Sequence, residues 1–316
     1  MVRDILILIE VSPESLSRIE AAGFKAQVAL SAQDRTAAIK SLGAHLEVVL
    51  TNGSTGLSAA QIAALPELKL ICALGAGYEK IDLGAAHARG IVVTHGPGTN
   101  DSSVADHAIA LLMSIVRAIP QVDAAARRGQ WAQSRQPRPT LSKKKLGILG
   151  LGNIGQQIAR RAVGGFEMTV GYHSRHSREN SSFTYFDTPT ALAAWADFLI
   201  VATPGGAGTF HLVDTNVLKA LGPDGYLVNI ARGSVVDTAA LIEALNNHDI
   251  AGAALDVLEG EPEVPKALIN LTNLILTPHI GGRSPEAVAA TVGLVIDNLK
   301  AYFADGAVLT PVPRGE

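Results

Sequence analysis

Residues 145–163 read KLGILGLGNIGQQIARRAV, and this stretch decides the fold. A short apolar run typical of a buried strand leads into glycines at 150, 152 and 155, and a helical stretch follows. Gly-x-Gly-x-x-Gly between a strand and a helix is the context that dinucleotide binding requires. The first glycine makes a tight turn, the second lets a pyrophosphate approach the backbone, and the third lets helix and strand lie close together. A purely structural glycine turn is the alternative. We favour a dinucleotide site formed by Gly150, Gly152, Asn153, Ile154 and Gly155.

The end of the next apolar run, MTVGYHS (168–174), bears on which dinucleotide binds. An NAD site would place Asp or Glu there to accept hydrogen bonds from the ribose 2′-hydroxyl. Here the run ends in His173, Ser174 and Arg175, with Arg178 close behind. A guanidinium and a hydroxyl suit a 2′-phosphate, so the sequence predicts NADP, with NAD as the alternative. The His173-x-x-His176 spacing resembles a metal pair, but no cysteine or clustered acid accompanies it, and we expect no metal site.

Apolar runs typical of strands alternate with helical stretches on both sides of the glycine motif. They lie at residues 4–10, 46–52, 68–74 and 91–95 before it, and at 168–174, 197–204, 226–232, 250–257 and 273–279 after it. Such alternation is typical of mostly parallel sheets that are covered on both faces. We therefore predict an α/β fold with two doubly wound parallel-sheet domains. A flavodoxin-like substrate domain spans 1–98 and 284–316, and a Rossmann nucleotide-binding domain of residues 99–283 is inserted into it.

Two further segments are distinctive. Residues 101–120 have helical spacing, and the sequence predicts one long helix that Pro120 ends. The polar stretch 129–140, which contains two prolines, is predicted to be a functional loop or an interaction arm.

Composition excludes several classes of function. The 316 residues carry a net charge of −3 without a basic tract, so we expect no nucleic-acid partner. A single cysteine excludes an intramolecular disulfide framework. The apolar run at 5–9 is too short for a membrane span or a signal-peptide core, and we expect a cytoplasmic protein without a membrane partner.

Three chemically active side chains each follow a predicted strand: Arg232 in NIARGS, Glu261 in LDVLEGEP and His279 in TPHIGG. Ligands of open α/β sheets bind at that edge. A solvated charge or a loop cap is the alternative for each residue alone. Together they suit reduction of a 2-oxo acid. Histidine can donate the proton, a carboxylate can orient it and favour its charged form, and an arginine can bind the substrate carboxylate or polarise the carbonyl oxygen.

In this order, the four motifs GLGNIG, NIARGSVVD, ALDVLEGEP and TPHIGG resemble the D-isomer-specific 2-hydroxyacid dehydrogenase family, and in particular its glyoxylate/hydroxypyruvate reductases. The resemblance implies that Arg232 binds substrate, that His279 is the acid/base and that Glu261 orients it. It also implies substrate contacts at Asn52, Gly53, Gly75, Ala76 and Gly77, and cofactor contacts at Thr203, Ile230, Asp256 and Gly281. Relatives dimerise through the nucleotide domain, which implies a homodimer here. Trp131 then either reaches the partner's substrate pocket or packs in the interface.

Other functions remain open at this stage. Within the family, they are hydroxyphenylpyruvate reduction and an NAD-dependent activity like that of phosphoglycerate dehydrogenase. From a different class, a nucleotide-sensing binding protein without turnover is the alternative. Our primary expectation is NADPH-dependent reduction of small 2-oxo acids.

Overall fold

The computed structural model describes residues 2–179 and 181–313. The chain divides into two compact units. One unit contains the described residues up to Asn100 and from Arg283 onward, and the other spans Asp101–Gly282. The second unit is therefore an insertion in the chain of the first. The borders expected from the sequence, at 98/99 and 283/284, lie beside these.

The first unit is built on a parallel sheet whose strands stand in the order β2-β1-β3-β4-β5. This is the order of flavodoxin-like folds. The strands are β1 (Arg3–Ile7), β2 (Phe24–Val28), β3 (Val48–Thr51), β4 (Leu70–Ala73) and β5 (Val92–Thr94). Each of β3 and β4 is buried along its whole length, as expected for central strands covered on both faces.

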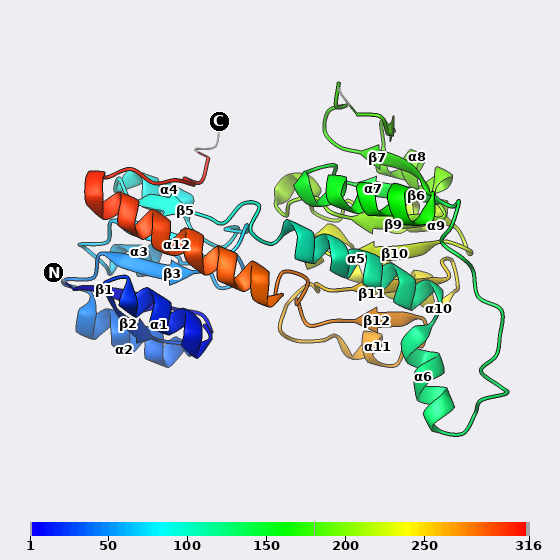
Figure 1. Ribbon diagram of the computed structural model, residues 1–316, viewed down its shortest axis with the longest axis horizontal. Helices are drawn as coiled ribbons and strands as arrows, with labels where there is room; N and C mark the ends of the chain where they lie inside the picture. The colour runs from blue at the N-terminus through cyan, green and yellow to red at the C-terminus, as the bar shows by residue number, and fades with distance from the viewer. Residues whose placement is uncertain (1, 180, 314–316) are drawn as a thin grey trace. The chain divides into compact units, whose positions relative to one another are not determined.

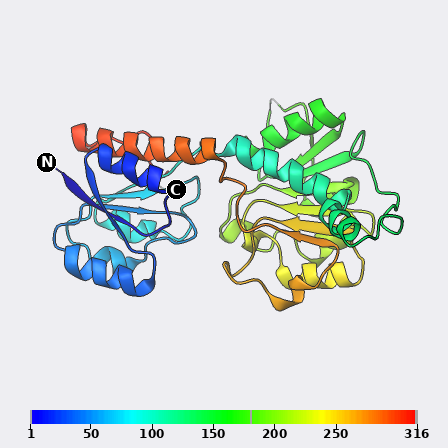
Figure 2. The ribbon, with the colours of Figure 1, turned by 60° about the horizontal axis from the view of Figure 1, so that its bottom comes forward.

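Helices cover both faces of this first sheet. They are α1 (Pro13–Ala21), α2 (Ala32–Leu42), α3 (Ala59–Ala63), α4 (Leu83–Ala88) and α12 (Pro285–Asp305). Alternate residues of β1 separate the two cores: Ile5 and Ile7 join a cluster with α1 and α12, whereas Leu6 joins a cluster with α2, α3 and α4. Figure 2 shows α1 and α12 on one side of the sheet and α2 on the other.

The second unit holds a parallel sheet with the order β12-β11-β10-β9-β6-β7-β8. The order reverses beside β6, as in dinucleotide-binding folds. The strands are β6 (Lys145–Leu149), β7 (Thr169–His173), β8 (Thr184–Tyr185), β9 (Phe198–Val201), β10 (Tyr226–Asn229), β11 (Gly252–Leu255) and β12 (Leu274–Leu276). The two sheets confirm the predicted fold class.

Two layers of helices enclose the second sheet (Figure 1). One layer contains α5 (Asp101–Val116) and α7 (Asn153–Phe166), and the other contains α8 (Pro189–Trp195), α9 (Thr215–Leu221) and α10 (Thr238–Asn246). The remaining elements are α6 (Ile119–Arg127), α11 (Lys266–Ile269) and the short 3-10 turns η1 (Ala207–Thr209) and η2 (Gly233–Val235). The sheet is therefore fixed on both faces, and its carboxyl edge is left to loops.

The single long helix predicted for 101–120 is wrong. The helix ends at Val116, Ala118 is left-handed at φ 49°, and a second helix begins at Ile119, at 56° to the first. Pro120 lies in the first turn of that second helix, where a missing N–H costs nothing. The proline therefore begins a helix instead of ending one.

By length and hydropathy, α12 could cross a membrane, and so could α5 and α6 taken as one bent span. The apolar side of α12 is used within the first unit, where Val292, Val295 and Leu299 join the core cluster of β1, β3 and β4. The hydropathy of α12 therefore follows from its packing in the core.

Within each unit, a hydrogen bond joins the segment that leads to the other unit to the segment that returns from it. In the first unit, Thr291 Oγ1 donates to Thr99 Oγ1 at 2.8 Å. In the second unit, Ser103 Oγ donates to the carbonyl of Gly281 at 2.6 Å. The outgoing and returning segments thus lie next to each other in both units.

Candidate active site

The glycine turn after β6 has the geometry that its sequence predicts. Gly150 has φ 96°, and a Cβ there would lie 2.8 Å from backbone atoms of Ala202 and Thr203. A Cβ at Gly155 would lie 2.2 Å from the carbonyl oxygen of Gly150, whereas one at Gly152 would meet nothing within 4 Å. The first and third glycines are therefore needed by the fold. The second leaves open space at the start of α7.

The start of α7 offers binding groups for an anion. Its N-cap residue, Gly152, has no side chain that could accept hydrogen bonds from the N–H groups of the first turn. Asn153 and Ile154 lie in this turn. Unpaired N–H groups and the helix dipole favour a phosphate at such a terminus. Thr203, on the loop after β9, has a buried Oγ1 with no hydrogen-bond partner among the described residues. An orphaned hydroxyl, an uncapped helix and an open glycine together fit a bound dinucleotide.

At the end of β7 lie the residues predicted to recognise a 2′-phosphate. His173 Nδ1 donates to the carbonyl of Phe186 at 2.8 Å, and Ser174 Oγ donates to the carbonyl of His176 at 2.7 Å. Arg175 is exposed. The hydroxyl of Ser174 is thus held within its own loop, whereas Arg175 is exposed and accessible to an added phosphate.

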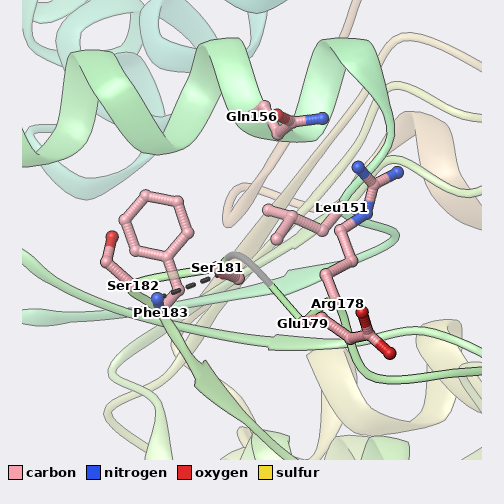
Figure 3. A pocket seen from close by; sticks show the side chains of 7 residues that line it. All are labelled: Leu151, Gln156, Arg178, Glu179, Ser181, Ser182 and Phe183. Atoms are coloured by element: carbon pink, nitrogen blue, oxygen red, sulfur yellow. Dashed lines mark hydrogen bonds between the residues drawn. The ribbon is translucent and has the colours of Figure 1, made fainter.

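A cavity of about 450 Å³ borders the same region (Figure 3). It is lined by Leu151, Gln156, Arg178, Glu179, Ser181, Ser182 and Phe183. The side chain of Arg178 lies beside Leu151 of the glycine turn and points toward the first turn of α7. Its backbone N–H donates to the buried Tyr172 hydroxyl at 2.8 Å, which fixes the loop. Arg178 is therefore a second guanidinium available near the start of α7.

Arg232 follows β10, and two glycines make room for it. A Cβ on Gly205 would lie 2.8 Å from Cγ of Arg232, so the aliphatic stem packs directly on the Gly205 backbone. A Cβ on Gly233 would lie 1.9 Å from the carbonyl carbon of Leu258. The loop after β11 therefore closes directly onto the residue next to Arg232. Neither glycine was singled out from the sequence, although Gly205 stands in the Gly-rich stretch PGGAG.

His279 and Glu261 form a hydrogen-bonded pair. His279 Nδ1 lies 2.8 Å from Glu261 Oε2, while Glu261 Oε1 accepts the backbone N–H of Leu258 at 2.8 Å. Because the carboxylate accepts, Nδ1 carries the proton. Within the described residues, Nε2 of His279 makes no hydrogen bond, and the side chain is 37% exposed. The outer nitrogen can therefore exchange a proton with a ligand.

The electrostatics of the pair favour an ionised carboxylate. Burial raises the pKa of Glu261. Hydrogen bonds from His279 and the Leu258 N–H, with the positive charges of His279 and Arg232, outweigh burial and hold that pKa below its ordinary value. The charge of Arg232 makes the smallest of these contributions to the lowered pKa of Glu261. Arg232, Glu261 and His279 thus form one electrostatic group at the carboxyl edge of the sheet.

Asp256 anchors the loop that carries His279. Its carboxylate accepts four hydrogen bonds, from His107 Nε2 (3.2 Å), Thr277 Oγ1 (2.6 Å) and the backbone N–H groups of Ile280 (2.9 Å) and Gly281 (2.9 Å). Its carbonyl accepts the N–H of His279, which has a left-handed φ of 54°. The carboxylate is 3% exposed, and burial raises its pKa. The four hydrogen bonds lower the pKa by more than burial raises it, so the net pKa of Asp256 lies below its ordinary value. Asp256 therefore holds the His279 loop in place.

The other residues expected at the cofactor are placed as follows. Ile230 is 7% exposed and belongs to the core between the sheet and α5. A Cβ on Gly281 would lie 3.0 Å from Asp256 Oδ2, so a side chain at this position would press against the carboxylate that anchors the loop.

A second histidine–carboxylate pair was missed from the sequence. His211 Nε2 lies 2.9 Å from Glu259 Oε1, and Glu259 Oε2 accepts the N–H of Thr238 at 3.1 Å. The backbone N–H of His211 donates to the carbonyl of Ser234. This pair joins the loops after β9, β10 and β11. Its partners are far apart in sequence, and no local pattern indicates the contact.

In the first unit, the two loops expected to contact substrate lie against each other. A Cβ on Gly53 would lie 2.7 Å from the carbonyl carbon of Gly77. Asn52 Oδ1 accepts the N–H groups of Ser54 and Thr55, which fixes the tight turn after β3. Among the described residues, the N–H groups of Ala76 and Gly77 have no hydrogen-bond partner. This leaves two adjacent donors after β4.

The arm after α5 is exposed. No residue of α6 is buried, and Trp131 is 71% exposed. Among the described residues, no three His, Cys, Asp or Glu side chains gather as a metal site would require.

Comparison with known proteins places this geometry in a family. The model of the D-isomer-specific 2-hydroxyacid dehydrogenase NAD-binding domain matches residues 109–281. A 2-ketogluconate reductase of Gluconobacter oxydans is 42% identical over 275 residues, or 87% of this chain and 88% of the relative. A glyoxylate/hydroxypyruvate reductase of Arabidopsis thaliana is 41% identical over 84% of this chain and 85% of its own length.

Solved structures agree. An NADPH-dependent glyoxylate/hydroxypyruvate reductase from Sinorhizobium meliloti, in complex with NADP and malonate, superimposes with a TM-score of 0.87 at 38% identity, covering 99% of this chain and 97% of that one. A 2-hydroxyacid dehydrogenase from Ketogulonicigenium vulgare gives a TM-score of 0.90 at 36% identity, covering 99% of both chains. The chain therefore belongs to the D-isomer-specific 2-hydroxyacid dehydrogenase family and is an NAD(P)-dependent enzyme.

Proposed function

We propose that this enzyme reduces small 2-oxo acids, such as glyoxylate and hydroxypyruvate, to D-2-hydroxy acids, with NADPH as the preferred reductant. The observation that carries the proposal is the hydrogen bond between His279 and Glu261, with the charge of Arg232 acting on the same carboxylate. Several similar proteins are named glyoxylate or hydroxypyruvate reductases, which supports this substrate class.

His279 supplies the proton. Bound reduced nicotinamide provides the hydride that adds to the carbonyl carbon of the substrate. Negative charge then grows on the carbonyl oxygen, and Nε2 of His279 donates its proton there, which completes the hydroxyl group. Glu261 accepts from Nδ1 at 2.8 Å, so it fixes the ring orientation and stabilises the imidazolium before transfer. The ionised state of Glu261 suits this role.

Two groups are proposed to bind the anionic part of the substrate. Arg232 offers a planar guanidinium that can pair with a carboxylate through two hydrogen bonds and can also polarise the carbonyl oxygen. The N–H groups of Ala76 and Gly77, which lack partners in the described part of the chain, supply further donors for the carboxylate. Asn52 and Gly53 support this loop from the neighbouring turn.

The preference for NADPH rests on the end of β7. Ser174 and Arg175 stand where an NAD site would carry an acidic side chain, and Arg175 is exposed. A guanidinium pairs well with a 2′-phosphate. The similar S. meliloti reductase is NADPH-dependent and was solved with NADP, which supports the same choice here. NAD remains the weaker alternative.

We further propose a cytoplasmic homodimer. A helix with no buried residue, α6, and an arm with an exposed tryptophan, Trp131, offer apolar surface for a second copy of this chain. Sedimentation of the purified protein tests the dimer, and a monomer at micromolar concentration would contradict the dimer.

A substrate panel tests the proposed reaction. Glyoxylate, hydroxypyruvate, hydroxyphenylpyruvate and 2-ketogluconate would each be offered with NADPH and with NADH, and loss of nucleotide absorbance would be followed. We expect the highest kcat/KM for a small 2-oxo acid with NADPH. Chiral analysis of the product should give the D-isomer. No turnover with any 2-oxo acid would favour a nucleotide-sensing protein instead, and a best substrate with a bulky side chain would reassign the substrate class.

A further inference from the structure

The loop after β4 is held from one side by the segment that follows β5. The backbone N–H of Gly96 donates to the carbonyl of Gly75 at 2.7 Å. The ring of His95 donates from Nδ1 to the carbonyl of Ala76 at 3.0 Å. Two successive carbonyls of the loop are therefore fixed by two successive residues of a neighbouring segment.

Fixing these carbonyls also orients the loop's N–H groups. A peptide unit is planar and trans, so its C=O and the following N–H point in opposite directions. Gly96 thereby directs the N–H of Ala76, and His95 directs the N–H of Gly77, away from residues 95–96. Neither of these two N–H groups has a hydrogen-bond partner among the described residues. Gly75, at φ 112°, allows the chain to turn into this arrangement.

The position of His95 is itself fixed. Its ring meets the Tyr78 ring edge to face, with centroids 5.2 Å apart and an interplanar angle of 87°. Its backbone N–H donates to the carbonyl of Thr310 at 3.1 Å, and Thr310 Oγ1 donates to the carbonyl of His95 at 2.6 Å. The nearly fully buried Asn298 of α12 accepts from the N–H of Thr310 at 3.1 Å. The segment near the C-terminus thus clamps His95 from both sides.

We propose that His95 is a positioning residue for substrate binding. The hydrogen bond from His95 to the Ala76 carbonyl orients the peptide plane between Ala76 and Gly77, so that the Gly77 N–H points at the carboxylate of the 2-oxo acid. The two hydrogen bonds with Thr310 fix the backbone of His95. This rests on the proposed function of the 75–77 loop. It gives the segment at 309–312 a role in substrate affinity in addition to its pairing with β5.

Two substitutions of His95 separate this role from a general effect on folding. His95→Phe keeps a flat ring against Tyr78 but removes the donor, and His95→Asn restores a donor close to the position of Nδ1. His95→Phe should raise KM for glyoxylate and the Kd of oxamate, a carboxylate that is not reduced, by about tenfold, the effect of losing one hydrogen bond to a charged group. KM for NADPH and kcat should stay near the wild-type values. His95→Asn should recover most of the lost affinity.

Two further variants complete the test. Thr310→Val should weaken oxamate binding to a smaller extent, because it removes one of the two contacts to the His95 backbone. His45→Phe is the control, since His45 is an exposed histidine of the same unit. Unchanged oxamate affinity in His95→Phe overturns the inference and leaves the proposed reaction intact. Equal losses for oxamate and NADPH also overturn it, because they show a general disturbance. Wild-type protein that binds neither oxamate nor any 2-oxo acid overturns the proposed function, and this inference with it.

Discussion

Glu261 and His279 are joined by a 2.8 Å hydrogen bond, and the second oxygen of Glu261 is held at the same distance by the N–H of Leu258. The carboxylate cannot rotate without losing one of these contacts. The orientation of the His279 ring is therefore set by the loop after β11 as well as by its own loop, which Asp256 anchors.

Glu261→Gln should lower kcat/KM for 2-oxo acid reduction by about 10²–10³-fold, the scale of a well-placed proton donor. The amide leaves the ring without a negative partner, so the decline of activity toward high pH should also shift to lower pH. Steady-state rates across pH measure both effects. Glu263→Gln, an exposed neighbour in the same loop, is the control and should behave as wild type. A Glu261→Gln enzyme with normal rates would remove Glu261 from the mechanism.

Arg232→Lys should reduce kcat/KM by about tenfold or more, because lysine keeps the charge but cannot form two parallel hydrogen bonds with a carboxylate. The loss should appear largely in KM for the 2-oxo acid, with KM for NADPH nearly unchanged. Arg117→Lys, an exposed arginine of the same unit, serves as the comparison. Near-native kinetics of Arg232→Lys would place the substrate carboxylate elsewhere.

Arg175→Ala should weaken NADPH binding by about 1.5–3 kcal/mol, the contribution of a hydrogen bond to a charged group, and should change NADH binding little. Fluorescence titration with both nucleotides measures this. Arg178→Ala is the informative companion, because that guanidinium points toward the first turn of α7. If only Arg178→Ala weakens NADPH binding more than NADH binding, the 2′-phosphate is bound by Arg178, which lines the cavity, and not by Arg175. Equal losses for NADH and NADPH in both variants would contradict a 2′-phosphate role.

Alanine at three glycines should separate folding from binding. Gly155→Ala should lower Tm, because its Cβ would lie 2.2 Å from the Gly150 carbonyl. Gly152→Ala meets nothing within 4 Å and should keep a normal Tm while it weakens NADPH binding, since the methyl group occupies the path of the pyrophosphate. Gly164→Ala, in the interior of α7 with open space around it, should stabilise the unit by about 0.5–1 kcal/mol. A large loss of Tm in Gly152→Ala would show that this glycine serves the fold instead.

Acid should destabilise the second unit. Asp256, Glu259 and Glu261 all have pKa values below the ordinary ones, because hydrogen bonds to their charged forms outweigh burial. A carboxyl group whose pKa is lower in the folded state stabilises the fold above its unfolded pKa, and that contribution is lost as pH falls through the folded pKa. Tm should therefore fall as pH is lowered from about 5 to about 3.

The matched variants for this pH effect are Glu259→Gln and Glu243→Gln. Glu259→Gln removes one of the titrating groups, so its Tm should start lower at pH 7 and depend less steeply on pH than that of the wild type. Glu243 is an exposed residue of α10, and its substitution should leave the pH dependence unchanged. Parallel Tm curves for the wild type and Glu259→Gln would contradict the assignment.

Sequence periodicity was sufficient to predict most central strands, since β3, β4, β9 and β10 are buried along most of their length and are therefore mostly apolar. The strand β2 is not among the predicted ones, because FKAQV lies at the edge of its sheet and most of its residues are exposed or half-buried. The two-residue β8 is too short to show any period. The prediction that Pro120 ends a helix was wrong because a proline is found both after the end of a helix and in the first turn of a helix.

Local pattern could place Arg232, Glu261 and His279 at the same sheet edge, because each follows a strand of a parallel sheet. It could not supply the contacts that support them. The His211–Glu259 pair spans 48 positions, and the Asp256–His107 contact spans 149. Such pairs are decided by the tertiary fold, and nothing in a single sequence links their members.

The hydrogen bond from Ser103 to Gly281 closes the inserted unit on itself. The two ends of residues 101–282 therefore lie next to each other, so we expect that the unit can be excised as one continuous segment. A short linker could seal the gap left in the host, where Thr99 and Thr291 are likewise in contact. We therefore expect that the nucleotide-binding unit can be transferred into another scaffold through a single pair of adjacent junctions.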